Sequence, residues 1–221
     1  MPSAHVINIG VHVLSGLIAM LLGFSIVFMA KGTARHKRFG RWFFYATLVV
    51  CMAAALGLFA FRFLPVFAVL TVLVWYQLLG GWRAAQTQGA GPNALDAFLT
   101  VLATGFTVWL TPIVIEQTTG AKALVYSTLA AVASMLFYDS VRWLFPRRWY
   151  ARLWLYEHSY KMLAALFGML SALVGNVVRY GQPWSQLLPS ALGLAVIVFF
   201  FWRISRGEGQ ILSVPDAMRG Q

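Results

Sequence analysis

Long hydrophobic runs separated by short polar stretches make up almost the whole chain. A helix needs about 20 apolar residues to cross the hydrocarbon core of a bilayer, and several runs reach that length. Seven can be drawn, at about 6–29, 42–61, 64–82, 97–117, 123–144, 155–178 and 185–204. The pattern therefore predicts an all-α integral membrane bundle of about seven transmembrane helices.

The breaks between the runs predict how the helices connect. Only Arg62 to Leu64 separates the second run from the third, and Pro65 follows directly, which favours a tight hairpin between antiparallel neighbours. A glycine- and proline-containing stretch at 89–93 predicts the loop before the fourth helix. We expect a single transmembrane bundle over 1–204 and a short cytoplasmic tail over 205–221.

Composition supports lipid as the outer solvent. The chain is 60% hydrophobic and 10% charged, which leaves too little polar surface to cover a soluble globule of this size. The formal charge of +11 comes from short basic clusters between apolar runs, so it predicts a membrane orientation rather than a nucleic-acid partner. The single cysteine, Cys51, excludes a disulfide framework.

Basic residues fall very unequally on the two sides of the seven-helix arrangement. One side has three, Arg62, Lys122 and Arg179. The other has thirteen, namely Lys31, Arg35, Lys37, Arg38, Arg41, Arg83, Arg142, Arg147, Arg148, Arg152, Arg203, Arg206 and Arg219. Because cytoplasmic loops carry the excess of Lys and Arg, we expect the N-terminus outside the cytoplasm and the C-terminus inside it.

Ionisable residues at membrane depth are the first candidates for chemistry, because they are costly there and usually face the bundle interior. In the first run, His12, Gly16, Ala19 and Gly23 lie on one helical face, and the small residues predict a close helix contact. His12 is then either a haem or metal ligand or an interior histidine that is hydrogen-bonded to a neighbouring helix. We favour the second interpretation.

The sixth run carries a second polar stripe. His158 and Met162 share a helical face with Ala165, Met169 and Asn176, so the stripe faces the interior and offers soft ligands for copper or haem. Methionines at this spacing are also common in ordinary cores. Glu157 and Lys161, four residues apart, are placed for an intrahelical ion pair.

Polar groups accumulate at the predicted cytoplasmic level. Asp139, Glu157 and His158 lie at the bases of the fifth and sixth runs, and His36 lies in the first basic loop. Together they form a candidate metal or proton-handling site, although Asp139 with Arg142 and Glu157 with Lys161 are equally explained as structural pairs. No recognisable catalytic constellation is present in the sequence.

Four short patterns resemble a family of uncharacterised bacterial multi-pass inner-membrane proteins over most of the chain. They are His12-x-x-x-Gly16, the basic loop 31–41, the segment 75–83 with Gly80 and Gly81, and Glu157-His158-x-x-x-Met162. The resemblance implies a bacterial inner-membrane location and directs attention to His12, His36 and His158. It implies no reaction.

A looser similarity links the chain to diheme b-type cytochromes, which hold haem between histidines of facing helices. Two classes of function therefore stay open. The first is a non-catalytic membrane subunit or small transporter with a polar site near the cytoplasmic side. The alternative is a redox protein that binds haem b or a metal ion through His158, His36 and Met162. Besides the bilayer, we expect other membrane subunits or a homo-oligomer as partners.

Overall fold

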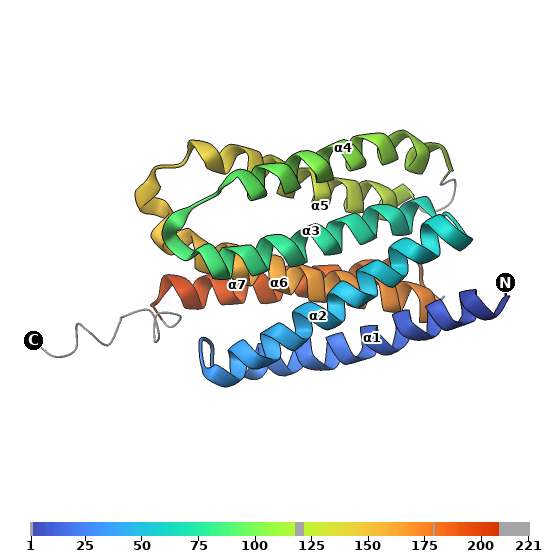
Figure 1. The fold of residues 1–221 in the computed structure, drawn as a ribbon, viewed down its shortest axis with the longest axis horizontal. Coiled ribbons are helices and arrows are strands. Elements are labelled where there is room, and N and C mark those ends of the chain that lie inside the picture. Colours follow the sequence, from blue (N-terminus) through green and yellow to red (C-terminus); the bar gives the residue numbers. More distant parts are fainter. Residues whose placement is uncertain (1, 118–121, 179, 208–221) are drawn as a thin grey trace, which may run out of the picture.

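The computed structural model describes residues 2–117, 122–178 and 180–207, and these residues form seven long helices (Figure 1). The basic residues Arg179 and Arg219, and most of the predicted tail, lie outside these ranges. In chain order the helices are α1 (Pro2–Phe28), α2 (Ala34–Leu56), α3 (Pro65–Thr87), α4 (Ala94–Gln117), α5 (Lys122–Val141), α6 (Arg147–Val177) and α7 (Trp184–Ser205). Single turns of other helix types, η1 (Gly57–Phe61), η2 (Gln88–Ala90) and η3 (Arg142–Leu144), extend α2, α3 and α5.

All seven helices are long and apolar enough to cross a membrane, which confirms the predicted all-α fold and is compatible with a membrane bundle. Several helices extend beyond the predicted apolar runs at one end of the bundle. For example, α2 begins at Ala34 and α6 at Arg147, whereas hydrophobicity alone placed these starts near 42 and 155. Basic residues end a hydrophobic run without breaking a helix, because they have good helix propensity.

Two central helices, α3 and α6, organise the bundle. They pack against each other over a long interface, and each also contacts helices on both of its sides (Figure 1). One apolar core joins α3 to α4 and α5, a second joins α1 and α2 to α3 and α6, and a third joins α6 to α7. A side chain on α3 or α6 can therefore meet either half of the molecule.

The predicted tight hairpin is confirmed. Only Arg62 to Leu64 separate η1 from α3, and Pro65 occupies the first turn of α3, where its missing N–H leaves no helix bond unmade.

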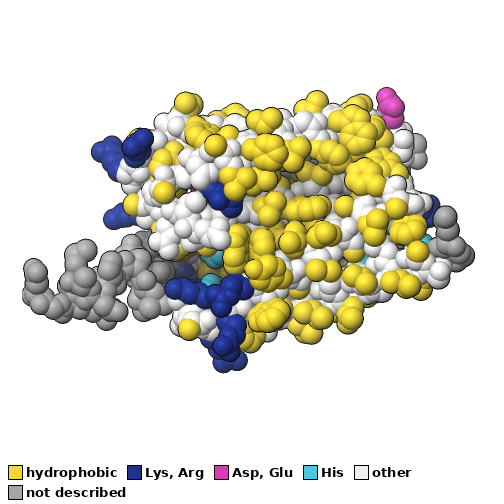
Figure 2. Space-filling view, in the orientation of Figure 1, with side chains coloured by type: hydrophobic (Ala, Val, Ile, Leu, Met, Phe, Trp, Pro, Cys, Tyr) yellow, Lys and Arg dark blue, Asp and Glu magenta, His cyan; other side chains and the backbone are white. Residues whose placement is uncertain are grey.

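The distribution of side chains on the surface is compatible with a membrane bundle. In Figure 2, hydrophobic side chains cover the long sides of the bundle, whereas dark-blue Lys and Arg side chains gather mainly at the end where α7 finishes. We call this the basic end. It also carries the first turns of α2, α4 and α6 and the last turns of α3 and α5.

Gly80 and Gly81 allow α3 and α6 to approach closely near the basic end. A Cβ atom added to Gly80 would lie 3.0 Å from Lys161 Cδ, and one added to Gly81 would lie 2.9 Å from Met162 Sδ. A larger residue at Gly81 would also crowd Lys161 Cβ at 3.1 Å, an atom fixed to α6. Two of the short patterns noted in the sequence, 75–83 and 157–162, are therefore the two sides of one helix contact.

Candidate functional site at the basic end

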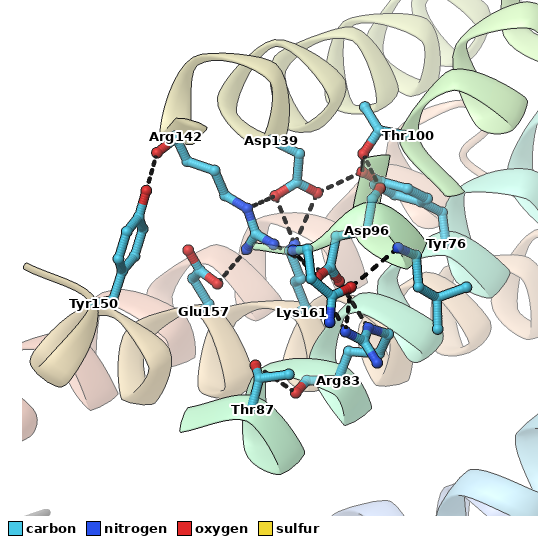
Figure 3. A network of polar contacts seen from close by, with 12 residues as sticks. Tyr76, Arg83, Thr87, Asp96, Thr100, Asp139, Arg142, Tyr150, Glu157 and Lys161 are labelled. Carbon is cyan, nitrogen blue, oxygen red and sulfur yellow. Dashed lines mark hydrogen bonds and ion pairs between the residues drawn. The ribbon is translucent and has the colours of Figure 1, made fainter. Parts of the chain in front are cut away.

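Six charged side chains from four helices and one adjoining turn meet inside the basic end of the bundle (Figure 3). We call them the charged network, and they are Arg83, Asp96, Asp139, Arg142, Glu157 and Lys161. The network contains three of the six acidic residues in the whole chain. Five of its members are buried and Arg83 is partly exposed, so its pairing must offset a large desolvation cost.

Asp139 and Lys161 form the most deeply buried pair. Lys161 is 1% exposed, and its Nζ donates to both carboxylate oxygens of Asp139 at 2.8 Å. The Tyr76 hydroxyl donates to Asp139 Oδ2 at 2.6 Å and lies 2.8 Å from the Thr100 hydroxyl. Asp139 therefore links α5 to α6 and α3, and through Tyr76 to Thr100 on α4.

Arg142 connects all three acids of the network. Its Nη1 donates to Glu157 Oε2 at 2.5 Å, its Nε lies 3.6 Å from Asp139 Oδ1, and its Nη2 lies 3.8 Å from Asp96 Oδ1. The Tyr138 hydroxyl completes the environment of Glu157 by donating to Oε1 at 2.7 Å. Three carboxylates therefore surround the Arg142 guanidinium, although its buried Nε makes no hydrogen bond.

Asp96 and Arg83 close the network toward the aqueous side. Arg83 Nε and Nη2 donate to the two oxygens of Asp96 at 2.8 and 3.1 Å, a bidentate pair. The backbone N–H of Asn93 also donates to Asp96, at 2.9 Å. Asp96 therefore fixes the loop before α4 to the end of α3.

The network is electrically balanced. Its three arginine and lysine side chains carry +3 and its three carboxylates carry −3, and each carboxylate has a cation within 2.8 Å or less. Such an arrangement meets the usual condition for stable charge in an apolar interior, in which every charge is paired and hydrogen-bonded.

The predicted intrahelical pair of Glu157 with Lys161 is wrong. Both residues lie on the face of α6 that meets the other network helices, but Glu157 pairs with Arg142 and Lys161 with Asp139. Partners on other helices replace the local one because these buried carboxylates and cations lie at the same depth. The predicted interaction of Asp139 with Arg142 is present, at 3.6 Å.

His158 points away from the network although it follows Glu157 directly, because successive residues are about 100° apart around a helix. Its Nδ1 lies 2.9 Å from the carbonyl oxygen of Gly81 on α3. A carbonyl can only accept, so Nδ1 carries the hydrogen, and in the neutral ring Nε2 keeps its lone pair. A histidine that binds a metal commonly donates its other ring N–H to a carbonyl in this way, which fixes the orientation of the ring.

His36 lies beside His158. The two ring centroids are 6.4 Å apart with an interplanar angle of 78°, and His36 Nδ1 is buried without a hydrogen-bond partner. His36 is not in a loop, as the sequence suggested, but in the first turn of α2, where the Thr33 side chain accepts a bond from its N–H at 3.1 Å. The start of α2 therefore places the His36 ring beside His158.

Lys31 completes what we call the histidine corner, defined as Lys31, His36 and His158. Its Nζ donates to the carbonyls of Ile26 and Val27 at 2.6 and 2.8 Å, and its charge acts on both histidines. Burial, and secondarily the charge of Arg203, lowers the pKa of Lys31 from 10.5 to about 8. Unlike Lys161, Lys31 has no carboxylate within ion-pair distance among the described residues.

His12 lies away from both groups, nearer the other end of α1. Its Nδ1 lies 3.1 Å from the Val50 carbonyl of α2, which agrees with the favoured interpretation of an interior histidine bound to a neighbouring helix. The predicted contact stripe is confirmed, because Ala19 is buried and Gly23 packs closely on Leu166 and Phe43. The stripe on α6 is buried at Ala165 and Met169, but Asn176 is exposed.

The structure divides the predicted metal site into two parts. Glu157 and Asp139 belong to the charged network, and His36 and His158 belong to the histidine corner. Within the described residues, no group of three or more His, Cys, Asp or Glu side chains is arranged to hold one ion. Met162 lies next to the corner, since both it and His158 contact Gly81.

Sequence reasoning missed Arg83 and Asp96, because they lie one residue outside the predicted apolar runs 64–82 and 97–117. It also missed the tyrosines Tyr76 and Tyr138, which looked like ordinary apolar residues. A signal that could have found them is the shared level of Asp96, Asp139 and Glu157, half of the six acids of the chain, at the same predicted end of the bundle.

Two hollows on the bundle are lined by residues outside the charged network. One, of about 460 Å³, is an apolar groove between α1 and α2. The other, of about 300 Å³, lies between the ends of α6 and α7 and is lined by Arg152 and Arg206 among others.

Comparisons with protein-family models, with curated proteins and with solved structures found no match. The resemblances noted in the sequence are therefore untested expectations.

Proposed function

We propose that this chain is a non-catalytic subunit of a membrane assembly, whose charged network holds α3, α4, α5 and α6 in one fixed arrangement. The observation that carries the proposal is the balance of three carboxylates by three cations inside the bundle, with each carboxylate bound by a cation. A fully paired network rigidifies a core.

The same proposal includes the location and the orientation of the chain. We place it in a bacterial inner membrane with the basic end at the cytoplasmic face and the start of α1 at the opposite face. The excess of Lys and Arg at the basic end supports this orientation. The partner is another membrane subunit or a second copy of the chain.

Variants of the network can distinguish a structural role from proton transport. Lys161→Met alone leaves Asp139 as a buried carboxylate without its closest cation and should lower thermal stability strongly, whereas Asp139→Asn with Lys161→Met removes both charges and should recover most of that loss. Exposed Lys37→Met is the control for loss of one lysine. Each variant is also reconstituted in liposomes for proton-flux measurement with a pH-sensitive dye.

A structural network predicts that proton flux equals that of protein-free liposomes in every variant. A flux that is present in the parent protein and disappears in the stable double variant would overturn the proposal, since it would show that Asp139 and Lys161 handle protons. Native mass spectrometry from lipid nanodiscs would test the assembly, because a subunit should be released from its native membrane as a defined complex and not as a monomer.

A second candidate function is binding of a metal ion or haem by His36 and His158, with Met162 as a soft neighbour. The observation that favours it is the orientation of His158 by the Gly81 carbonyl beside His36, whose buried Nδ1 has no partner. With metal–nitrogen distances of about 2.0–2.1 Å, two imidazoles on opposite sides of one ion have centroids roughly 6 Å apart. The 6.4 Å between the His36 and His158 centroids is compatible with that spacing.

This candidate is tested by visible absorption spectra and metal analysis of detergent-purified protein, followed by titration with Cu(I) and Zn²⁺. Binding at the corner should be lost in His158→Ala and weakened in Met162→Leu, most strongly for the softer Cu(I). His12→Ala is the matched control, because His12 also bonds a backbone carbonyl but belongs to a different part of the bundle. A colourless preparation that takes up neither metal would remove the candidate.

A further inference from the structure

The hollow between the ends of α6 and α7 combines two features that are seldom found together. Its walls include the cationic side chains Arg152 and Arg206, and also the apolar side chains Leu155 and Ile204. Tyr156 and Ser205 add hydroxyl groups. A ligand that fits such walls needs an anionic group and an attached apolar portion.

The tryptophan beside the hollow places it at the level where a bilayer changes from hydrocarbon to water. Trp202, one turn before Arg206, is 46% exposed on the outside of the bundle, and tryptophan is enriched at this interface. The Arg206 guanidinium lies over the Trp202 ring, 4.1 Å from its centroid. This cation–π contact holds Arg206 at the interface.

No acid of the described residues neutralises these two arginines. All the ion pairs found in the described ranges belong to the charged network, and Asp96, Asp139 and Glu157 are the acids nearest in depth. Because the network is balanced internally, it cannot supply counter-charge to Arg152 or Arg206. An external anion would satisfy both.

From these observations we propose that the α6–α7 hollow is a binding site for the headgroup of an anionic glycerophospholipid. The phosphate would accept hydrogen bonds from Arg152 and Arg206, whose planar guanidinium groups match phosphate geometry. The glycerol and the first acyl carbons would lie against Leu155 and Ile204. Basic pockets between transmembrane helices on the cytoplasmic side bind lipid headgroups in this way. The inference is independent of the proposed subunit function.

The test is native mass spectrometry of the full chain in detergent, titrated with phosphatidylglycerol, phosphatidylcholine or inorganic phosphate. We expect one tight equivalent of phosphatidylglycerol, weaker phosphatidylcholine binding, and no displacement of the lipid by millimolar phosphate. Arg152→Gln with Arg206→Gln should weaken the first equivalent tenfold or more. Arg147→Gln with Arg148→Gln removes the same charge from exposed positions of the same end and should leave that equivalent unchanged.

A second variant separates the site from general surface charge. Ile204→Trp fills the hollow without changing any charge, and it should also reduce binding of the first equivalent. Equal losses in the two double-arginine variants would overturn the proposal in favour of non-specific attraction. Full competition by inorganic phosphate would overturn it in favour of a soluble anion. Thermal stability of the two double-arginine variants should match that of the parent, because all four arginines are exposed.

Discussion

The charged network and the histidine corner lie on adjacent faces of α6 and stabilise a lysine amine in different ways. Each contains a lysine whose amine is removed from water. In the network, Lys161 donates to two carboxylate oxygens at 2.8 Å. The Arg83–Asp96 and Arg142–Glu157 ion pairs belong to the same network. In the corner, Lys31 Nζ donates to the carbonyls of Ile26 and Val27 and lies 4.8 Å from the centroid of the Phe200 ring. One region compensates buried charge with opposite charge, and the other does so with backbone dipoles.

This difference separates a region built for packing from one with binding capacity. The carboxylates of the network already have cations and hydroxyl groups around them, so an added ligand would have to displace existing bonds. In the corner, His36 Nδ1 has no partner and His158 is oriented through only one of its two nitrogens. Saturated polar groups stabilise a fold, whereas unsaturated ones are available to a ligand.

The largest expected effect comes from removing the cation that joins the network. Arg142→Met leaves Glu157 buried with only the Tyr138 hydroxyl, and breaking a buried ion pair from one side costs about 3–5 kcal/mol. Arg148→Met, at an exposed position of the same end, should change stability very little. Thermal unfolding in detergent, followed by tryptophan fluorescence, measures both. Similar melting temperatures for the two variants would mean that the network does not hold the bundle together.

A smaller loss should follow from removing one hydroxyl of the network. Tyr76→Phe deletes the 2.6 Å hydrogen bond to Asp139, and a bond to a charged group contributes about 1.5–3 kcal/mol. Tyr126→Phe on α5 is the control, because Tyr126 is exposed. The same unfolding assay compares the two. If Tyr76→Phe melts like the parent, Lys161 and Arg142 are sufficient for Asp139 without the tyrosine.

Gly81 is where the two regions meet, because its Cα faces Met162 and Lys161 and its carbonyl binds His158. In Gly81→Ala the new Cβ would lie 3.1 Å from Lys161 Cβ, an atom that cannot move without α6. Overpacking of this kind costs about 1–3 kcal/mol. It should also disturb the histidine corner, so any metal binding there should weaken together with stability. Gly40→Ala, with open space around it, is the control and should affect neither.

The fold was largely predictable from the sequence, because the need for long apolar segments in a bilayer leaves few alternatives. The positions of Pro65 and the seven apolar runs were sufficient for the helix order and for the hairpin between α2 and α3. Helix ends were less predictable, since residues such as Arg35 and Arg148 end a hydrophobic run but continue a helix. That error of a few residues placed His36 in a loop and omitted Asp96 and Arg83.

The pairing within the candidate site could not be predicted for a different reason. Spacing along one helix identified Glu157 and Lys161 as neighbours, but it says nothing about Asp139 and Arg142 on the adjacent segments. Depth in the membrane can be estimated from sequence, whereas rotation of each helix about its axis depends on packing. The close approach at Gly80 and Gly81 turns Lys161 toward Asp139, and no periodicity in α6 alone contains that information.

The smallest expected effect distinguishes the two lysines by their protonation. The pKa of Lys31 is lowered to about 8 by burial, so the folded protein binds fewer protons than the unfolded chain between about pH 8 and its ordinary pKa of 10.5. Stability should therefore rise slightly as the pH is raised through that window. Lys31→Met should remove this contribution. The size of the effect is limited because Lys31 is only partly buried.

Amine acylation followed by peptide mass spectrometry measures the difference directly. Only the neutral amine reacts, so labelling of Lys31 should show a midpoint near pH 8 in the folded protein. Lys161, 1% exposed, should stay unlabelled until the bundle unfolds, whatever the pH. If Lys31 instead begins to react only near its ordinary pKa of 10.5, its amine is solvated or paired with a negative charge, and the contrast between the two lysines would be wrong.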